Sequence, residues 1–565
     1  MHTHTVLKSS AIAMLIIAAS APAMAGKLGI PGEIARKNAD ISYHIAQQET
    51  LSSIALKFTG TAKNWPAIAK ANRIANDRTI PIGSEITVPS RLLPDRSAFA
   101  TVVALRGAVN MTNKAGEVVD SRIGAQVPEG AVIVTDDDGF ITFQLQDGTT
   151  FALPPSSNLQ LTLLRIQDYT ERSRTQLTLK QGRVSSEVTP FKLPGAQYQI
   201  QTPLAIAGVR GTRFRVNAEP QQTYSEVLNG TVGVTANGKQ QAARPIIASY
   251  GSVVGSDGRQ SAPIPLLPAP RMDGAAVQER LPVRVQLAQP DAAAFRVTVS
   301  TDQDGLHRVA ETRVPGDHGQ ALARFADLDD GDYVIRASAI DSIGLEGMEA
   351  VQPLHVKARP FAPLLQTPGP KVRTADGAAA DIAFQWAQVG DAVRYRLQIA
   401  RDPGFSDLLS DRPELASNHD QQSGLKEGLY YWRVASIADK AGKFAQGPWS
   451  DAAPLAVLPQ QQAPEASQEA DRMRFSWRGE TGQQFVFESA ATPGFEHASQ
   501  HIETTESAVS FATPEAGTYY ARVQSIDPDG YRGAFSPPQK YVVERRWRTG
   551  DGGSLNSGPG PVRAD

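Results

Sequence analysis

Few residues of this 565-residue chain have the types and spacing of a catalytic site. The chain has no cysteine, which excludes thiolate catalysis and cysteine-ligated metal centres. Ser423 and Lys426 match the Ser-x-x-Lys spacing of acylating enzymes, but they fall in a predicted loop instead of at a helix start. His497 and His501 would suit a metal only on a helix, and a connection between strands is predicted there. The sequence therefore predicts no catalytic residue, no metal site and no cofactor, although paired carboxylates brought together by the fold stay open.

Two clusters of like charge could bind ions instead. Arg210, Arg213 and Arg215 could hold an anion, because guanidinium groups bind such ligands in two-pronged fashion. Arg213 and Arg215 alternate with apolar residues, however, and this pattern favours one solvated strand face with ion pairs. The run 136–138 is three aspartates, which suggests calcium, but it lacks the Asp-x-Asp-x-Asp-Gly spacing and a downstream glutamate. A polar turn is favoured there.

Composition limits the classes of partner and the number of domains. The chain carries 56 Lys and Arg against 58 Asp and Glu, a formal net charge of -2, which argues against nucleic acid as a partner. A chain of this length predicts several domains, since one domain holds about 150 residues.

The first 25 residues predict a secretory signal peptide. Lys8 precedes an apolar run over 11–19, and small residues lead to a cleavage site after Ala25. The alternative is a retained membrane anchor, but the run is far shorter than the roughly 20 residues that span a bilayer. We therefore expect an exported protein of the periplasm or cell envelope of a Gram-negative bacterium, without a transmembrane segment after signal cleavage. Residues 26–41 are predicted to be a linker.

Residues 42–90 predict a small module in the order strand, helix, helix, strand. A brief strand at 43–45 precedes a helix that ends near Phe58, for which Thr50 can serve as the N-cap. A second helix begins at Trp65 and ends at Asn72. A turn at Gly83 leads into the last strand.

This module resembles the LysM domain. The matching residues are Tyr43, Thr50, Leu51, Ile54, Ala55, Phe58, Asn72, Ile74, Ile80, Gly83, Ile86 and Pro89. The resemblance implies binding of peptidoglycan or a related N-acetylglucosamine glycan by two loops. Those loops correspond to Gln48, Glu49, Thr50 and Leu51, and to Asn72, Arg73, Ile74 and Ala75. The chain departs from the family at Gln48-Glu49, where Gly-Asp is usual, and the alternative roles of Leu51 and Asn72 are core packing and a helix stop.

Residues 97–265 predict an all-β domain. Short β runs are separated by turn signals such as Asp138-Gly139, Asp147-Gly148 and Gln181-Gly182. The segment resembles the FecR domain, through motifs that include Arg106-Gly107-x-Val109, Thr202-Pro203, Val209-Arg210-Gly211-Thr212-Arg213-Phe214 and Asn229-Gly230. Signalling members of that family carry a cytoplasmic anti-sigma segment and a membrane helix before this domain. A signal peptide and a LysM-like module stand there in this chain, which disfavours a direct sigma-factor role.

Three repeats predict β-sandwiches over 266–357, 358–458 and 459–545. Similar Gly-x-Tyr strands begin at Gly331, Gly428 and Gly517. In the second and third repeats, a tryptophan stands earlier in the same repeat. The repeats resemble fibronectin type III or related immunoglobulin-like modules, which act as spacers or as protein-binding surfaces. The tail, residues 546–565, is predicted to be disordered.

The expected fold class is therefore a mainly β, multidomain chain with one βααβ module, one all-β domain and three sandwiches. The domain order predicts an exported, non-enzymatic adaptor or scaffold that binds peptidoglycan and meets an envelope protein through its FecR-like domain or its repeats. One alternative is a periplasmic sensory or regulatory protein whose FecR-like domain acts on a receptor or membrane signalling partner. A wall-processing enzyme is a third hypothesis.

Overall fold

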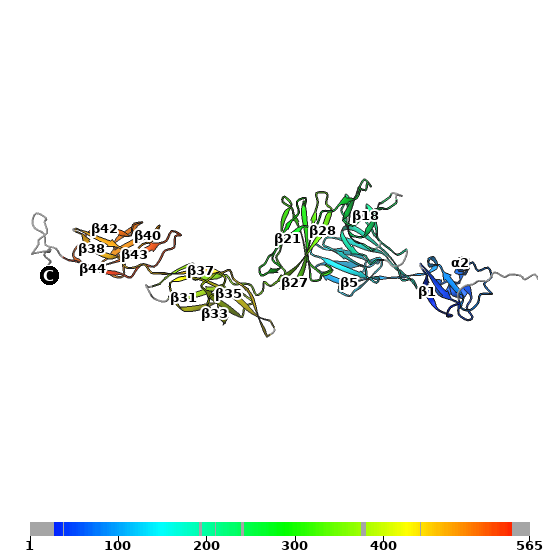
Figure 1. Cartoon of the computed structure of the whole chain (residues 1–565), viewed down its shortest axis with the longest axis horizontal. Helices are drawn as coiled ribbons and strands as arrows, with labels where there is room; N and C mark the ends of the chain where they lie inside the picture. Colours follow the sequence, from blue (N-terminus) through cyan, green and yellow to red (C-terminus); the bar gives the residue numbers. More distant parts are fainter. Residues whose placement is uncertain are drawn as a thin grey trace, which may run out of the picture. The chain divides into compact units, whose positions relative to one another are not determined.

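The computed structural model describes residues 28–37, 39–190, 195–209, 211–238, 242–374, 380–440, 442–469 and 471–544 (Figure 1). The predicted signal peptide, the predicted tail and Arg210 lie outside the described residues. The chain divides into two compact units. The first comprises residues 1–276, 284–325 and 332–354, and the second comprises residues 277–283, 326–331 and 355–565. Among the described residues, no helix has the length and apolar character needed to cross a membrane.

The N-terminal module of the first unit packs two helices on a three-stranded antiparallel sheet. Its elements are β1 (Ile34–Lys37), β2 (Asp40–His44), α1 (Leu51–Thr59), the short 3-10 turn η1 (Ala62–Asn64), α2 (Trp65–Ala71), β3 (Glu85–Val88) and the 3-10 turn η2 (Ser90–Leu92). The sheet order is β1-β2-β3. Strand β1 lies inside the segment predicted as a linker, and its side chains are all exposed, so no apolar alternation marks it in the sequence.

The helices form where the apolar spacing predicts them. Ile54, Ala55 and Phe58 of α1 are completely buried, together with Ile68 of α2. Thr50 caps α1, because its side chain accepts a hydrogen bond from Ser53 N while Ser53 Oγ accepts one from Thr50 N. The core of this module is separate from the other cores of the chain.

A closed β domain follows, made of strands β4 to β20. The strands are β4 (Asp95–Ser97), β5 (Phe99–Arg106), β6 (Val109–Thr112), β7 (Gln126–Pro128), β8 (Val132–Thr135), β9 (Phe140–Leu145), β10 (Thr150–Leu153), β11 (Asn158–Gln167), β12 (Arg172–Glu187), β13 (Gln197–Gln201), β14 (Ala205–Val209), β15 (Arg213–Ala218), β16 (Gln222–Asn229), β17 (Thr231–Ala236), β18 (Arg244–Ile247), β19 (Tyr250–Gly255) and β20 (Ile264–Pro265). Side chains from both ends of this segment share one large core, which includes Phe143, Phe151 and Phe214.

The predicted turn at Gln181-Gly182 is wrong, because β12 runs through it as one strand. Up to Gln181 the strand pairs with β11, and from Gly182 onward it pairs with β15. Gly182 has φ +84°, and a Cβ there would lie 2.5 Å from the carbonyl oxygen of Ser156. A glycine is needed because the strand bends sharply as it passes from one group of partners to the next. The tight turn at Asp147-Gly148 does form, between the antiparallel strands β9 and β10.

Most of the first repeat belongs to the first unit, whereas its segments 277–283, 326–331 and 355–357 belong to the second. Its strands are β21 (Arg271–Asp273), β22 (Val277–Gln278), β23 (Val283–Ala288), β24 (Ala294–Ser300), β25 (Arg308–Pro315), β26 (Gln320–Phe325), β27 (Gly331–Ile340) and β28 (Glu346–Val356). One sheet has the order β21-β23-β26, and the other runs β28-β27-β24-β25. The inner faces bury Phe295, Val297 and Ala337, as expected for a two-sheet sandwich.

The second repeat belongs to the second unit and has the same two-sheet plan. Its strands are β29 (Leu365–Thr367), β30 (Lys371–Thr374), β31 (Ala380–Trp386), β32 (Arg394–Ala400), β33 (Leu408–Leu415), β34 (His419–Leu425), β35 (Gly428–Lys440), β36 (Lys443–Trp449) and β37 (Ala453–Pro459). Trp386 is fully buried in one core with Tyr430 and Trp432. The tryptophan and the Gly-x-Tyr strand therefore meet inside the sandwich, as their types predict.

The third repeat completes the second unit. Its strands are β38 (Glu465–Glu469), β39 (Arg472–Ser476), β40 (Gln484–Ala490), β41 (Ala498–Thr504), β42 (Ala508–Ala512), β43 (Gly517–Ile526) and β44 (Gln539–Val543). Trp477 stacks on Phe487 with ring centroids 5.8 Å apart. The fold class expected from the sequence, mainly β with one helical module, is confirmed.

Candidate functional site

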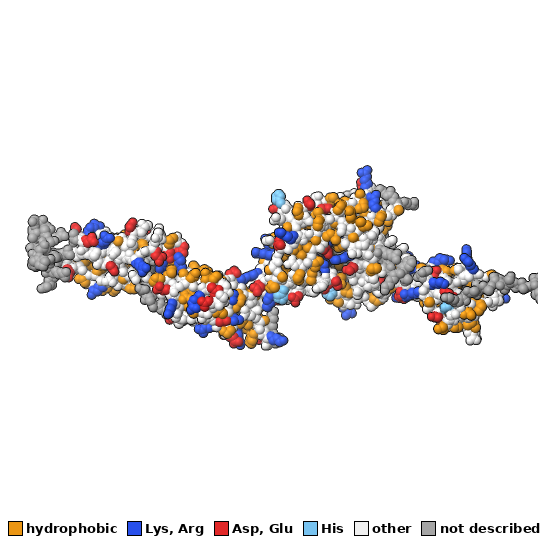
Figure 2. Space-filling view, viewed as in Figure 1, with side chains coloured by type: hydrophobic (Ala, Val, Ile, Leu, Met, Phe, Trp, Pro, Cys, Tyr) orange, Lys and Arg blue, Asp and Glu red, His pale blue; other side chains and the backbone are white. Residues whose placement is uncertain are grey.

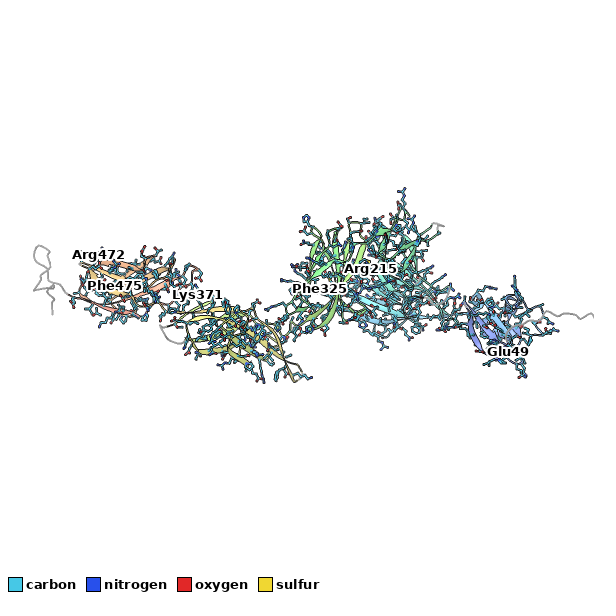
Figure 3. The ribbon with its side chains drawn as sticks, viewed as in Figure 1. Glu49, Arg215, Phe325, Lys371, Arg472 and Phe475 are labelled. Atoms are coloured by element: carbon cyan, nitrogen blue, oxygen red, sulfur yellow. The ribbon has the colours of Figure 1, made fainter. Side chains whose placement is uncertain are left out.

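The first predicted glycan loop turns one of its polar side chains away from solvent. Gln48 is exposed and has φ +66°, whereas Glu49 folds back toward β2. Glu49 Oε2 accepts hydrogen bonds from Tyr43 Oη at 2.6 Å and from Ala46 N at 2.9 Å, and Lys57 Nζ lies 3.3 Å from Oε1. Glu49 is labelled in Figure 3. Its carboxylate thus closes the loop onto the core instead of reaching toward a ligand.

Electrostatics fix Glu49 in its ionised form. Partial burial opposes ionisation, but the hydrogen bonds from Tyr43, Ala46 and Lys57 outweigh burial and hold the pKa of Glu49 below its ordinary value. Burial and the neighbouring carboxylate raise the pKa of Tyr43. The pKa of Lys57 is raised by its hydrogen bonds to Tyr43 and Glu49.

The rest of the first loop belongs to helix α1. Thr50 is exposed, but its hydroxyl caps the helix at Ser53 N. Leu51 is buried in the module core, so the alternative of core packing holds for its side chain.

The second predicted loop is tied down at Asn72. Asn72 Nδ2 donates to Ile68 O at 2.8 Å and to Thr87 O at 2.7 Å, while its Oδ1 accepts from Thr87 N at 2.7 Å. The side chain thereby joins the end of α2 to β3. Arg73 follows in an exposed position with φ +56°, Ile74 packs against the core, and Ala75 is exposed.

The eight predicted residues therefore separate into two groups. Gln48, Thr50, Arg73 and Ala75 face solvent. The side chains of Glu49, Leu51, Asn72 and Ile74 support the loops from inside. Of the eight predicted side chains, only those of the first group are therefore open to solvent.

A second polar site is one that sequence reasoning missed. Arg215 is only 4% exposed, so the predicted solvated strand face is wrong at this residue. Arg215 Nη1 lies 2.9 Å from Glu346 Oε1, and Nη2 donates to the carbonyl oxygens of Glu346 and Gly347, each at 2.6 Å. The ion pair was expected, but its partner lies 131 residues away in the first repeat. No local pattern could reveal that separation.

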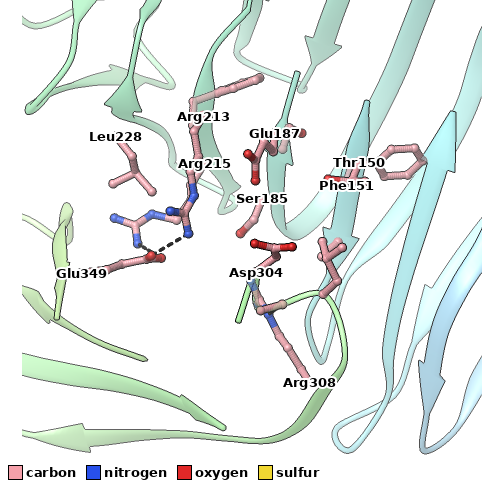
Figure 4. A pocket seen from close by; sticks show the side chains of 15 residues that line it. Thr150, Phe151, Ser185, Glu187, Arg213, Arg215, Leu228, Asp304, Arg308 and Glu349 are labelled. Atoms are coloured by element: carbon pink, nitrogen blue, oxygen red, sulfur yellow. Dashed lines mark hydrogen bonds and ion pairs between the residues drawn. The ribbon is translucent and has the colours of Figure 1, made fainter. Parts of the chain in front are cut away.

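Arg215 belongs to a larger set of charges that we call the interdomain ion cluster. Its members are Arg183, Arg213, Arg215 and Glu226 of the closed β domain, and Arg296, Arg308, Glu311, Arg336, Glu346 and Glu349 of the first repeat. Figure 4 shows Arg213 and Arg215 meeting Glu349, at 2.7 and 3.5 Å. A cavity of about 40 Å³ lies between the two parts.

The pKa values of two glutamates in the cluster are shifted in opposite directions. Burial raises the pKa of Glu226 to about 7, with Arg215 only partly offsetting it. Burial also opposes ionisation of Glu346, but Arg215, Arg183 and Arg296 outweigh it and hold the pKa of Glu346 far below its ordinary value. The difference arises because Glu346 makes short contacts with two of these arginines, whereas the contact made by Glu226 is to the backbone N of Glu346 at 3.4 Å.

The remaining candidate residues sit in ordinary strands and turns. Ser423 lies within β34, and His501 lies on β41 with its Nδ1 3.1 Å from Glu488 Oε1. Asp138 Oδ1 accepts a hydrogen bond from Ala108 N, and Asp137 Oδ1 accepts one from Ser156 Oγ, so these aspartates stabilise a turn. Within the described part of the chain, no three His, Asp or Glu side chains are grouped as a metal site would require.

Two family models match the chain. Residues 43–89 match the LysM domain, and residues 131–233 match the model described as FecR protein. The chain carries a LysM domain followed by a FecR domain. Both families are binding and signalling domains, and they typically belong to extracytoplasmic proteins. The FecR match includes all four closed-domain members of the interdomain ion cluster, whereas the partners in the first repeat lie beyond it.

Solved structures are similar to parts of the chain. A putative anti-sigma factor from Parabacteroides distasonis is 18% identical over 23% of this chain, with a TM-score of 0.19. The chain covers 57% of that protein's length, which is less than two thirds. The FN1-FN3 domains of chicken CNTN1 are 12% identical over 49% of this chain and 98% of their own length, with a TM-score of 0.20. No curated protein matches this chain.

Proposed function

We propose that this chain is an exported, non-enzymatic adaptor of the periplasm or cell envelope that binds peptidoglycan through its LysM domain. The LysM match over residues 43–89 carries the proposal. The loops that the family uses for N-acetylglucosamine leave Gln48, Thr50, Arg73 and Ala75 open to solvent, above side chains that hold the loop backbone in place. A shallow polar surface of this kind suits acetamido groups, whose polar atoms pair with backbone groups while their methyl groups cover small apolar faces.

The charge distribution agrees with a glycan partner. On the face shown in Figure 2, Lys and Arg side chains are dispersed among Asp and Glu, without a continuous basic surface. Together with the formal net charge of -2, the dispersed charges on this face argue against nucleic acid as the partner.

Sedimentation with purified peptidoglycan tests the proposal. The full mature chain should sediment, and the variant R73E/A75E should lose at least about tenfold in affinity, because two carboxylates replace exposed loop surface. The matched control is Arg78→Glu, an exposed change in the same connection outside the predicted site. Equal sedimentation of the full chain, of R73E/A75E and of a chain lacking residues 28–93 would reject glycan binding by LysM. The deletion must include β1 and Leu93, because β1 pairs with β2 and Leu93 is part of the module core.

The FecR match supports a second candidate, a sensory or regulatory role. In that case the FecR domain contacts a receptor or a membrane signalling partner. Crosslinking in living cells separates the two candidates, because only the second predicts a membrane signalling protein attached through residues 97–265. Turnover of labelled glycan by the purified chain would favour the third hypothesis, a wall-processing enzyme.

A further inference from the structure

Each of the three repeats has one sheet whose outer face carries charged side chains at matching positions. The cross-strand register identifies which positions are equivalent. Arg336, Arg433 and Arg522 stand at one position, because they lie opposite Thr298, Gln398 and Glu488 on the neighbouring strand. On the other side, Thr298 faces Glu311 and Gln398 faces Asp411. The ion pair of Arg296 with Glu311 therefore has its counterpart in that of Arg396 with Asp411.

In the second and third repeats the central arginine lies between two aromatic rings. The guanidinium of Arg433 is 4.0 Å from the ring centroid of Phe405 and 4.3 Å from that of Trp449. Arg522 is 4.1 Å from Phe495 and 4.0 Å from Phe535. These stacks cover the outer face of each sheet with side chains of the same repeat.

The first repeat lacks both rings at the equivalent positions. Asp302 accepts hydrogen bonds from the amides four and five residues later, as Asp402 does, so Gly305 corresponds to Phe405. Both residues have positive φ, +74° and +58°. Gly347 and Gly447 each approach a backbone carbonyl closely, which places Glu349 where the second repeat has Trp449.

The space left by the missing rings is where the closed β domain packs. Gly305, Leu306 and Glu349 line the cavity of Figure 4 together with residues of β10, β12 and β15. Thr142 Oγ1 donates to Leu306 O at 2.8 Å, and Glu349 pairs with Arg213 at 2.7 Å. A Cβ at Gly305 would lie 2.7 Å from Arg336 Nε, so any side chain there displaces the arginine.

An apolar contact continues the same interface. Tyr224 of the closed β domain is buried together with Leu266 and Leu345 of the first repeat. Gly344 approaches the ring of Tyr224 so closely that a Cβ would lie 3.0 Å from it. The interface thus combines buried ion pairs with a packed apolar edge.

We propose that glycine at position 305 and glutamate at position 349, in place of the two aromatic rings, make the outer face of the first repeat a dedicated docking surface for the FecR domain. The FecR-like closed β domain and the first repeat then act as one composite module, whereas the second and third repeats cover the same face with their own rings. The closed-domain surface around Arg183 and Arg215 is consequently unavailable to an external partner, which must bind elsewhere on this domain.

Arginine modification by phenylglyoxal on the full chain tests this proposal. Arg215 and Arg183 should react slowly in the wild-type protein, in contrast to Arg259, whose side chain is 88% exposed. The variant G305F/E349W rebuilds the aromatic pair and should raise the reaction rate of Arg215 at least tenfold. The matched control F405G/W449E should expose Arg433 and leave Arg215 protected. Far-UV circular dichroism of G305F/E349W verifies that the β-sheets of the chain stay folded.

A second variant decides the matter if G305F/E349W loses its β-sheet signal. Arg213→Glu lies on the closed-domain side and places like charges opposite each other at Glu349, so it should also expose Arg215. Slow, wild-type modification of Arg215 in a folded G305F/E349W, or in Arg213→Glu, would overturn the proposal.

Discussion

Gln48 holds a backbone conformation that suits glycine better, with φ +66°. The left-handed region costs an L-residue about 1–2 kcal/mol, which glycine avoids. Glycine loses part of this advantage because its unfolded chain has more conformational entropy to give up on folding. We predict that Gln48→Gly raises the free energy of unfolding of the LysM domain by about 0.5–1 kcal/mol. Urea denaturation of the two proteins measures the difference. Gln47→Gly, at a neighbouring exposed position without positive φ, should bring no gain.

Glu226 makes stability depend on pH in the direction opposite to most carboxylates. Its pKa is raised to about 7 in the folded protein by burial, above the ordinary 4.5. The folded state therefore holds the proton more tightly, so this group's contribution is fully present below pH 4.5 and is lost as the pH rises through about 7. Glutamine at this position stays neutral at every pH. We therefore predict that Glu226→Gln has a free energy of unfolding about 1–3 kcal/mol higher than that of the wild type at pH 8, with little difference at pH 4.5.

The control for this prediction is a carboxylate of the same cluster with the opposite shift. The pKa of Glu346 is held low, so its contribution is present above pH 4.5 and is lost as the pH falls through its folded value. Glu346→Gln should therefore destabilise the protein at pH 8. Urea unfolding at both pH values checks both variants, and a pH-independent effect of Glu226→Gln would contradict the assignment.

What the sequence predicts at single residues depends on how far away their partners lie. Thr50 was recognisable as an N-cap because its partner, Ser53, is three residues away. The positive φ at Gln48 agrees with the glycine that LysM domains usually have at this position, because glycine adopts such angles freely. Burial of Arg215 was not predictable, since alternation with apolar neighbours is equally compatible with solvent and with a second domain.

The helices and the end strand of the LysM domain depend on one side chain at their junction. Asn72 makes three hydrogen bonds that join α2 to β3. We predict that Asn72→Ala lowers the free energy of unfolding of this domain by about 2 kcal/mol, because the backbone groups of Thr87 lose their partners in a half-buried place. Thermal unfolding followed by circular dichroism measures it. Asn76→Ala, whose side chain accepts one exposed hydrogen bond from Arg78 N, should change stability by less than about 0.5 kcal/mol.

At the scale of elements, the sequence predicts what apolar spacing specifies. Helices α1 and α2 and the core strands with Trp386 follow their patterns, because burial on one face imposes the period. Strand β1 falls in the predicted linker, because its four side chains are exposed and only backbone pairing with β2 defines it. Gly182 was mistaken for a turn because a positive φ serves a bend within a strand as well as a hairpin.

At the scale of the whole molecule, the differences between the three repeats indicate the domain organisation better than their similarity does. The sequence predicts three sandwiches, of which the first is more divergent and lacks the tryptophan of the other two. The structure shows that the divergence includes Gly305 and Glu349, at the surface that meets the closed β domain. The first repeat lacks the tryptophan and the aromatic stack, and the closed β domain covers its outer face instead. The number of repeats therefore overstates the number of independent modules.

Buried ion pairs across this interface couple the folding of its two sides. Removing Arg215 takes the donor away from the buried carbonyl oxygens of Glu346 and Gly347 and weakens the neutralisation of the Glu346 carboxylate, and breaking a buried pair costs about 3–5 kcal/mol. We predict that Arg215→Met lowers the stability of the closed β domain and of the first repeat together by about this amount. Salt should change this loss little, because the pair is buried. Arg271→Met, which breaks an exposed pair with Asp273, should cost less than about 1 kcal/mol.

Hydrogen exchange with mass spectrometry on the full chain distinguishes joint from separate destabilisation. In Arg215→Met, peptides from β15 and β24 should lose protection to the same extent, because each side of the interface has lost the other's support. Peptides from α1 and from β35 and β43 should exchange as in the wild type, since these elements belong to cores of their own. Loss of protection confined to β15 would mean that the first repeat folds without the FecR domain.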